Sequence, residues 1–451
     1  MMKFRSWVPS ICTDANSNDS PSPPPPPKHL FSDSSTTSTT PSSSLDTTST
    51  MSSSLESNLS ILTLPSVPSL QKLSPENLNL SVSTLCITSI NPNKPLSINF
   101  LAMNKNLLYA ASGSIINVYE TINFTLVDTF NDQESSSGAV KSITFLNGKI
   151  FSAHQDCRIR VWKLIPIKQH KLVSTLPTIN DRLRHVLLPK NYVKVRRHKK
   201  KLWVEHHDAV SGLAVASKGC ATPFSKSEGL GVAQNLLYSI SWDRSLKIWD
   251  KSRCIESIKG HDDAINAVVV SCNGTIFSGS ADRRIKVWDK PFGEKKYGLV
   301  ATLEKHKSAV NALALSNDGS VLFSGSNDRS ILVWEREDSA NYMVVTGALR
   351  GHSKAILCLV NLDDLLFSGS ADRTIRIWQR GHDGRYCCLS VLDGHRKPVK
   401  SVVAVAEEVE EGCESNNNGV VKVFSGSFDG EIKVWQVVVS SARSLSPSHN
   451  M

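Results

Sequence analysis

Five histidines recur along the sequence, each followed by a serine and an aspartate that lie four residues apart. These residue types form the hydrolase triad, in which a histidine takes the proton of a serine nucleophile while an aspartate orients the histidine. An enzyme needs one such site, whereas this chain repeats the set in nearly identical surroundings. The repetition therefore predicts a structural role and no catalytic residue. The histidines are His206, His261, His306, His352 and His395.

The serine and the aspartate belong to a twelve-residue phrase that the chain repeats. Each copy predicts a strand, a tight turn at the aspartate and a returning strand, because an aspartate side chain bonds nearby turn amides. Close copies are FSGSADRRIKVW (277–288), FSGSNDRSILVW (323–334), FSGSADRTIRIW (367–378) and FSGSFDGEIKVW (424–435). Looser copies are YSISWDRSLKIW (238–249) and FSAHQDCRIRVW (151–162).

The final aromatic residues of these phrases mark a regular period along the chain. They are Tyr119, Trp162, Trp249, Trp288, Trp334, Trp378 and Trp435, with spacings of 43, 87, 39, 46, 44 and 57 residues. A four-stranded propeller blade takes about 40–45 residues. The longest spacing contains no second copy of the phrase, so we interpret it as one blade with insertions. The period predicts an all-β fold, a seven-bladed β-propeller.

The propeller is expected to span residues 82–438 and to be closed by a strand from its other end. The chain ends soon after Trp435, which leaves the seventh blade without an outer strand. The strand LCITSI at 85–90 is spare, and pairing it beside 432–438 would remove the exposed edges. Residues 1–80 are rich in Ser, Thr and Pro and bury too little apolar surface to fold, so we predict a disordered segment. Residues 439–451 are predicted to be a flexible tail.

The dipeptides GH (260–261, 351–352 and 394–395) and WD (249–250 and 288–289) resemble those of the WD-repeat family. The resemblance covers about residues 85–436. It implies that the histidine, a strand serine, the turn aspartate and the tryptophan of each blade form a hydrogen-bonded chain. The implied sets are His206–Ser239–Asp243–Trp249, His261–Ser278–Asp282–Trp288, His306–Ser324–Asp328–Trp334, His352–Ser368–Asp372–Trp378 and His395–Ser425–Asp429–Trp435.

Two blades depart from this pattern. The second keeps Ser152, Asp156 and Trp162 but has Ser136 where a histidine is expected. The first ends in Tyr119 and has no counterpart of the aspartate or the histidine.

The connection between the second and third blades, residues 177–205, is about 27 residues longer than the others. Thr178 is a suitable N-cap for a short amphipathic helix that ends by Pro189. NYVKV then alternates like a strand and leads into a basic run, and Trp203 is expected to anchor the insertion to the ring. Between 177 and 201 nine residues are basic and one is acidic, a net charge of +8, against +10 for the whole chain.

Three interpretations of this basic insertion stay open: a solvated loop, a protein-binding element, and a nuclear-import or nucleic-acid patch. No aromatic residues alternate with the basic ones, which weakens a role in base stacking. The insertion is expected on the face that such propellers commonly use for partners. Its candidate partner-binding residues are Arg196, Arg197, His198, Lys199, Lys200 and Lys201.

Two smaller features are also expected on that face. Arginine follows the turn aspartate in four successive blades and forms either a cationic arc or a set of solvated turn residues. Large aromatic residues precede the aspartate in two blades and act either as rim contacts or as filling between blades. The arginines are Arg244, Arg283, Arg329 and Arg373, and the aromatic residues are Trp242 and Phe428. On the opposite face, 406–419 is predicted to be a mobile acidic loop.

The stretch LPKNYVKVRRHKKKLWVEHHDAVSGL, followed by LLYSISWDRSLKIW, resembles a plant subgroup of WD-repeat proteins, the JINGUBANG-like proteins. The resemblance implies a non-enzymatic regulator in the nucleus and cytoplasm. It also implies a link to pollen germination and growth control through bound transcription regulators.

The leading hypothesis is a monomeric, non-enzymatic scaffold that binds partner proteins over the propeller face and the insertion. No phosphate loop, metal-ligand spacing or isolated carboxylate pair is present, so no cofactor, metal or small-molecule substrate is expected. The apolar runs are too short to cross a membrane. One alternative is a substrate receptor of a cullin-type ubiquitin ligase, but WDKS, WDKP and WERE lack the arginine of the usual W-D-x-R docking motif. The other alternative is a nucleic-acid-associated nuclear factor.

Overall fold

The protein is described here from a computed structural model. The structure describes residues 67–70, 80–92, 96–131, 137–166, 169–196, 198–216, 236–291, 293–294, 296–337, 343–381, 384–407 and 419–441. Most of the predicted low-complexity segment, the predicted acidic loop from residue 408 to 418, and the predicted tail after residue 441 lie outside the described residues.

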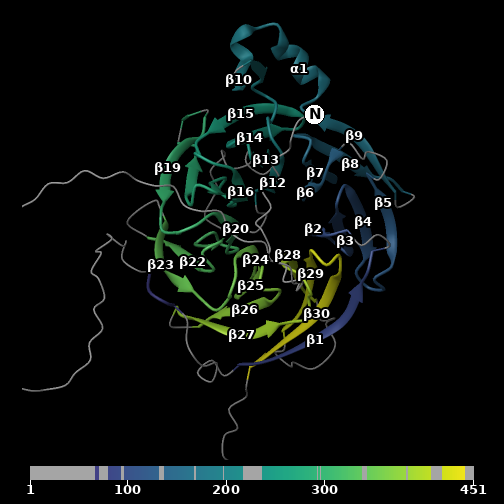
Figure 1. Ribbon diagram of the computed structural model, residues 1–451, viewed down its shortest axis with the longest axis vertical. Helices are drawn as coiled ribbons and strands as arrows, with labels where there is room; N and C mark the ends of the chain where they lie inside the picture. The colour runs from purple at the N-terminus through teal and green to yellow at the C-terminus, as the bar shows by residue number, and fades with distance from the viewer. Residues whose placement is uncertain are drawn as a thin grey trace, which may run out of the picture. The chain divides into compact units, whose positions relative to one another are not determined.

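Seven four-stranded antiparallel sheets form a ring, which confirms the predicted propeller (Figure 1). Blade 1 consists of β2 (Ile98–Asn104), β3 (Leu107–Ser112), β4 (Ile115–Glu120) and β5 (Leu126–Phe130). Blade 2 consists of β6 (Val140–Leu146), β7 (Lys149–His154), β8 (Ile159–Leu164) and β9 (His170–Leu176). Blade 3 consists of β12 (Val210–Val215), β13 (Leu236–Ser241), β14 (Ser245–Asp250) and β15 (Arg253–Lys259).

The remaining blades follow in the same order around the ring. Blade 4 consists of β16 (Ile265–Val270), β17 (Ile276–Ser280), β18 (Ile285–Asp289) and β19 (Gly298–Leu303). Blade 5 consists of β20 (Val310–Leu315), β21 (Val321–Ser326), β22 (Ile331–Arg336) and β23 (Met343–Leu349). Blade 6 consists of β24 (Ile356–Leu362), β25 (Leu365–Ser370), β26 (Ile375–Arg380) and β27 (Tyr386–Leu392). Blade 7 consists of β28 (Val399–Ala406), β29 (Gly419–Ser427), β30 (Ile432–Ser441) and β1 (Leu80–Ile90).

The repeated phrase forms the two middle strands of a blade and the turn between them. In blade 4 all five residues of β17 are buried. The turn is closed by the Arg283 amide, which donates to the Ser280 carbonyl over 3.2 Å, and by the Asp282 carboxylate, which accepts from the Arg284 amide over 2.9 Å. The aspartate carboxylate thus accepts a backbone amide that the tight turn would otherwise leave without a partner.

The core lies between neighbouring blades, because each sheet packs one face against the preceding blade and the other face against the following blade. Phe277 and Val287 of blade 4, for example, pack in one buried cluster with Val310 and Trp334 of blade 5. The inner strands contact each other in the order β2, β6, β12, β16, β20, β24, β28 and back to β2.

Strand β1 closes the ring by pairing antiparallel with β30. The predicted strand 85–90 forms the second half of this pairing, with Leu85 opposite Gln436 and Ile90 opposite Ile432. The pairing starts earlier than predicted, with Leu80 opposite Ser441, so both the expected disordered segment and the expected tail contribute residues to the sheet. On the other side of blade 7, Phe424 and Val434 pack with Ile98 and Leu108 of blade 1, which seals the joint.

The leader contributes a second ordered piece that the sequence did not predict. Residues 67–70 lie on blades 5 and 6, where Ser69 forms a parallel bridge with Ala348 of β23. In the part of the chain that the structure describes, no helix is long and apolar enough to cross a membrane.

Deletion of residues 80–90 is expected to destabilise the whole ring, because the edge of β30 then loses its partner strand. Losing about ten strand hydrogen bonds should lower Tm by roughly 10 °C or more, measured by differential scanning calorimetry. Deletion of residues 1–61 is the matched control and should leave Tm within about 2 °C. An unchanged Tm after the first deletion would show that the ring does not depend on this strand.

Candidate functional site

In five blades the structure joins the histidine, serine, aspartate and tryptophan into one buried chain. In blade 4, His261 Nδ1 is 2.8 Å from an Asp282 oxygen, His261 Nε2 is 2.8 Å from Ser278 Oγ, and Trp288 Nε1 donates to Ser278 Oγ over 2.9 Å. The same three contacts occur in the other four sets, with distances of 2.8–3.1 Å. These sets contain His206, His306, His352 and His395.

The burial of these chains shows what they can do chemically. Each of the five serines is 0% exposed and already bonded by a histidine and a tryptophan, so the hydroxyl is not presented to a substrate. Burial alone would raise the pKa of Asp282, but its bonds to His261 and to backbone amides lower that pKa to about 2. The carboxylate therefore stays charged and bonded at neutral pH, which suits a fully satisfied structural network.

The same network fixes one face of the ring. In each of these five blades the turn aspartate also accepts the amide of the residue after the histidine, as with Lys307 on Asp328 at 3.0 Å and Arg396 on Asp429 at 3.0 Å. The turn and the connection that enters each blade therefore lie together. We call the surface formed by these turns and connections the network face.

The four turn arginines lie on the network face in a left-handed conformation. Their φ angles lie between 68° and 77°, a region that costs a residue with a side chain about 1–2 kcal/mol relative to glycine. Blade 7 has Gly430 at this position, with φ of 89°. All four side chains are exposed, and none forms an ion pair with a residue that the structure describes. The arginines are Arg244, Arg283, Arg329 and Arg373.

Charge is unevenly distributed around the network face. Over blades 3 and 4 the residues after the histidine are acidic and exposed, namely Asp208, Asp262 and Asp263. Over blades 5 to 7 the corresponding exposed residues are Lys307, Lys354, Arg396 and Lys397. Together with two of the turn arginines, these residues make the exposed turns and histidine-following residues of blades 5 to 7 positively charged.

The two aromatic candidates also reach the surface of the network face. Trp242 is 41% exposed and Phe428 is 36% exposed. Lys141 Nζ lies 5.3 Å from the centre of the Trp242 ring, a cation–π contact between blades 2 and 3. Trp242 therefore covers a joint between blades and still leaves part of its surface exposed to a partner.

The insertion leaves blade 2 on the network face but packs against the outer edge of blade 3. Figure 1 shows its helix α1 (Ile179–Val186) and strand β10 (Tyr192–Arg196) beyond β15, outside the ring. The Asp181 carboxylate, 1% exposed, accepts the Cys254 amide of β15 over 3.1 Å. The insertion was expected to extend the network face. Asp181 instead holds it against the outer rim of blade 3, so that expectation is wrong.

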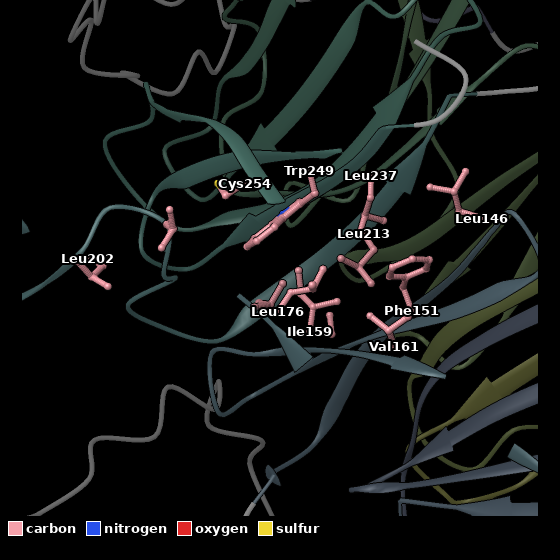
Figure 2. Close-up of a cluster of buried hydrophobic side chains, with 13 residues drawn as sticks. Leu146, Phe151, Ile159, Val161, Leu176, Leu202, Leu213, Leu237, Trp249 and Cys254 are labelled. Carbon is pink, nitrogen blue, oxygen red and sulfur yellow. The ribbon is translucent and has the colours of Figure 1, made fainter. Parts of the chain in front are cut away.

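The rest of the insertion is held by its own cap and by the cluster between blades 2 and 3. Thr178 Oγ1 accepts the Asp181 amide as the predicted N-cap. Leu202 of β11 (Lys199–Leu202) lies in the buried cluster with Leu176, Trp249 and Cys254 (Figure 2). Trp203 packs against the same cluster, and the buried Lys247 of blade 3 donates to its carbonyl. A short 3₁₀ turn, η3 (Pro189–Asn191), joins the helix to the hairpin.

Helix α1 turns its apolar side outward. Ile179 is 75% exposed, Leu183 59%, Val186 41% and the following Leu187 85%, while the helix docks through the polar Asp181 and through Arg182, which pairs with Glu205 at 3.1 Å. An amphipathic helix on a globular protein normally buries its apolar stripe. We call these four exposed residues the α1 stripe.

The basic hairpin β10–β11 stands next to this helix. Lys194, His198, Lys199 and Lys200 are exposed and Lys201 is partly buried. Arg197 and the side chain of Arg196 lie outside the described residues. The insertion thus combines an apolar stripe with neighbouring positive charge on one projecting element.

A family model for "WD domain, G-beta repeat" matches residues 252–289, 297–335, 343–379 and 386–436. The chain carries WD40 repeats. The matched segments contain four of the five hydrogen-bonded sets, and blades 1 and 2 lie outside them. WD40 propellers are generally protein-interaction scaffolds. The comparison with curated proteins gave no match.

Blade 2 completes its network from a residue that the sequence analysis missed. Ser152 Oγ accepts from Trp162 Nε1 over 2.8 Å, and its other contact, also 2.8 Å, is Nε2 of His154, two residues further along the same strand. Ser136, where a histidine was expected, lies outside the described residues. The signal was the phrase itself, which reads FSAH where other blades read FSGS.

His154 differs from the other network histidines in its surroundings. It is fully buried, and its Nδ1 has no hydrogen-bond partner among the described residues. Asp156, which would hold such a nitrogen, instead pairs with Arg160 at 2.9 Å. Burial and the nearby Arg160 charge lower the pKa of His154 to about 3.

Blade 1 replaces the network by contacts across its joint with blade 2. Tyr119 is buried at the place of the tryptophan. Asp128 Oδ2 accepts both the backbone amide and Nδ1–H of His170, at 2.8 and 2.7 Å, which leaves His170 Nε2 to accept the Tyr109 hydroxyl at 3.2 Å. Burial and Asp128 raise the pKa of Tyr109 to about 12, so the phenol keeps its proton. The period of the repeat contained no sign of this cluster.

One group of residues has the composition of a metal site. Donor atoms of His395, Asp429 and Glu431 lie within 4.8 Å of one another. Both ring nitrogens of His395 are already bonded, to Asp429 and to Ser425. The group is therefore part of the WD40 network of blade 7.

Replacing the four turn arginines by glycine is expected to leave Tm unchanged or slightly raised. Glycine costs about 0.5–1 kcal/mol in chain entropy, while the left-handed conformation costs an arginine about 1–2 kcal/mol. Thermal unfolding of the quadruple variant tests this. Arg284→Gly is the control and should lower Tm, because Arg284 pairs with Asp262 and Glu304. A lower Tm for the quadruple variant would show that the arginines stabilise the turns.

Acidification is expected to destabilise the wild type more than a His154→Ser variant. The unfolded His154 titrates near pH 6.5, and in the folded protein its pKa is about 3. The neutral folded form therefore contributes its full stability above about pH 6.5 and loses it as pH falls toward 3, by up to about 1.4 kcal/mol per pH unit. Urea unfolding at pH 7.5, 6 and 5 gives the free energy of unfolding at each pH. This free energy should fall more steeply with decreasing pH in the wild type than in the variant, and equal dependence on pH would contradict the assignment.

Proposed function

We propose that this WD40 propeller is a non-enzymatic scaffold that binds an acidic, amphipathic segment of a partner protein on its insertion. The observation that carries the proposal is the α1 stripe. Three large apolar side chains of one short helix and that of its C-cap Leu187 stand exposed, although the same helix buries Asp181 against blade 3. Exposed apolar patches of this kind are typical of protein interaction sites.

The charge of the insertion indicates the chemistry of the partner. Lys194, Lys199 and Lys200 are exposed beside the α1 stripe, and the segment 177–201 has a net charge of +8. Acidic residues on a partner would speed association and favour one orientation, while its apolar residues would cover the stripe. The positively charged residues of the network face over blades 5 to 7 offer the same partner, or a second acidic one, a further contact.

The finer parts of the proposal rest on resemblance. The insertion and its flanking strand resemble the JINGUBANG-like plant proteins, which favours a regulator that acts in the nucleus and cytoplasm on pollen germination or growth through bound transcription regulators. The basic hairpin has the composition of a nuclear-import signal, which agrees with a nuclear location.

Replacing Ile179 and Leu183 by serine is expected to weaken partner binding by about tenfold or more, since each buried aliphatic side chain contributes about 1.5–3 kcal/mol. Both positions are exposed, so Tm should not change. Partners recovered by affinity purification from the native tissue would be compared between the wild type and this variant. The dissociation constant of each recovered partner would then be measured with purified proteins.

Leu299→Ser is the matched control, because Leu299 is a comparably exposed apolar residue, 49%, on the outer strand of blade 4. It should bind like the wild type. A Lys199→Glu/Lys200→Glu variant should also weaken binding, more at low salt than at high salt. If the serine variant keeps every partner while the lysine variant loses nucleic acid, the insertion is a nucleic-acid site and the proposal is wrong.

A further inference from the structure

Residues Val67–Leu70 form a short strap that lies across the outer strands of blades 5 and 6. The Ala348 amide of β23 donates to the Pro68 carbonyl over 2.9 Å, and the Leu70 amide donates to the Ala348 carbonyl over 3.1 Å. The Leu70 carbonyl then accepts the Tyr386 amide of β27 over 2.9 Å. Arg350 donates through Nη2 to the Val67 carbonyl over 2.9 Å. The strap therefore bonds to both blades through its backbone.

Two side chains of the strap pack against buried clusters on either side of blade 5, Leu70 at the joint with blade 6 and Val67 at the joint with blade 4. Leu70 packs against the buried cluster that contains Trp378 and Tyr386 of blade 6. Val67 packs against the cluster that contains Met343 and Ala348 of blade 5. Pro68 and Ser69 stay exposed. The contact therefore depends on an extended backbone and on two aliphatic side chains three residues apart.

Blade 5 is shaped for this contact at Gly347. A Cβ at Gly347 would lie 2.2 Å from Leu70 Cγ and 3.0 Å from the Pro68 carbonyl oxygen. Glycine weakens a strand interior and often marks a place where another backbone approaches closely. Gly347 pairs with the residue before the tryptophan of its blade, and the equivalent positions of the outer strands carry side chains in the other repeated blades. These are Ser174, Glu256, Ala301 and Ser390.

The strap uses only a small part of the strand edge on which it lies. Among the described residues, β23 pairs with β22 along its length and with Ser69 at one point. Besides β22, no described residue pairs with β23 from Met343 to Thr346, where a longer extended segment would add further strand bonds. Such edges bind peptides by strand addition, with backbone bonds for affinity and side-chain pockets for selectivity.

We propose that the seam between β23 and β27 is a binding site for an extended peptide of a partner protein. The peptide carries leucine at the place of Leu70 and a second aliphatic residue three positions earlier, and it runs parallel to β23. Residues 67–70 are the occupant that the chain itself supplies. A segment tethered within the same chain competes at a higher effective concentration than a free peptide. A partner segment that pairs along more of β23 displaces it.

A full-length Leu70→Asp variant tests the site, because the charged side chain should release the strap from the seam. The probe is a fluorescein-labelled peptide of residues 62–74, LTLPSVPSLQKLS. Fluorescence anisotropy should show that the peptide binds Leu70→Asp at least about tenfold more tightly than it binds the wild type, whose own strap competes. The same peptide with aspartate in place of its leucine at position 70 should not bind.

Adding Gly347→Val to Leu70→Asp should abolish binding, because the valine fills the space that Leu70 occupies. Adding Ala301→Val, the equivalent change in blade 4, is the matched control and should leave binding intact. Tm of each variant would be measured to show that it is folded. If Gly347→Val lowers Tm, Arg350→Ala replaces it as the test. This change removes one bond to the strap and should weaken binding several-fold.

Three results would overturn the proposal. The first is equal affinity of the wild type and Leu70→Asp for the probe. The second is binding that survives Gly347→Val in a folded protein. The third is a concentration-dependent dimer of the wild type that Leu70→Asp abolishes in size-exclusion chromatography, since the seam would then accept a second copy of this chain and not a partner peptide.

Discussion

The antiparallel pairing of β1 with β30 is the constraint on which the rest of the structure depends. Every other blade is built from strands that follow one another closely, whereas blade 7 draws its outer strand from residues 80–90 and its other three from residues 399–441. In a closed ring of sheets every blade has a neighbour on both sides. Without β1, the edge of β30 would be unpaired and the joint between blades 7 and 1 would be open. Pairing the two ends of the propeller closes both. The packing of blade 7 on blade 1, through Phe424 and Ile98, then follows from the closed ring.

In blades 3 to 7 a buried polar chain does the positioning that tight packing alone does not. The serine, histidine, aspartate and tryptophan of a set are fully bonded to each other, so each adds rigidity without leaving a buried polar atom unpaired. The turn on the network face is held in the same way in successive blades. This regular support is what allows arginines to occupy left-handed turn positions, because the strain is carried by a rigid frame. The side chains are then free to face solvent.

Three separate parts of the surface depart from what stability alone would favour. The turn arginines occupy positions where glycine fits better, α1 exposes its apolar side, and Gly347 weakens an outer strand to admit the strap. Each departure costs some stability and leaves a surface that can contact another polypeptide. They lie on the network face, on the rim of blade 3 and at the seam of blades 5 and 6. A propeller with several such surfaces is suited to bring partners together.

The sequence by itself determined the blades, the five buried sets and the closing strand. The blades and the buried sets repeat along the chain, and the closing strand was inferred because the last repeat lacks an outer strand. A period of one blade is visible without knowledge of which residues meet. Only the tertiary structure decided that His154 replaces the absent histidine of blade 2, that Tyr109, His170 and Asp128 join blades 1 and 2, that α1 faces outward, and that residues 67–70 lie on β23. Each of these depends on a contact between segments with no common pattern, or on the direction in which one polar residue such as Asp181 is pulled. Periodicity in a sequence reports what every blade shares, whereas contacts that occur once are set by the space and the unpaired atoms that the closed ring leaves.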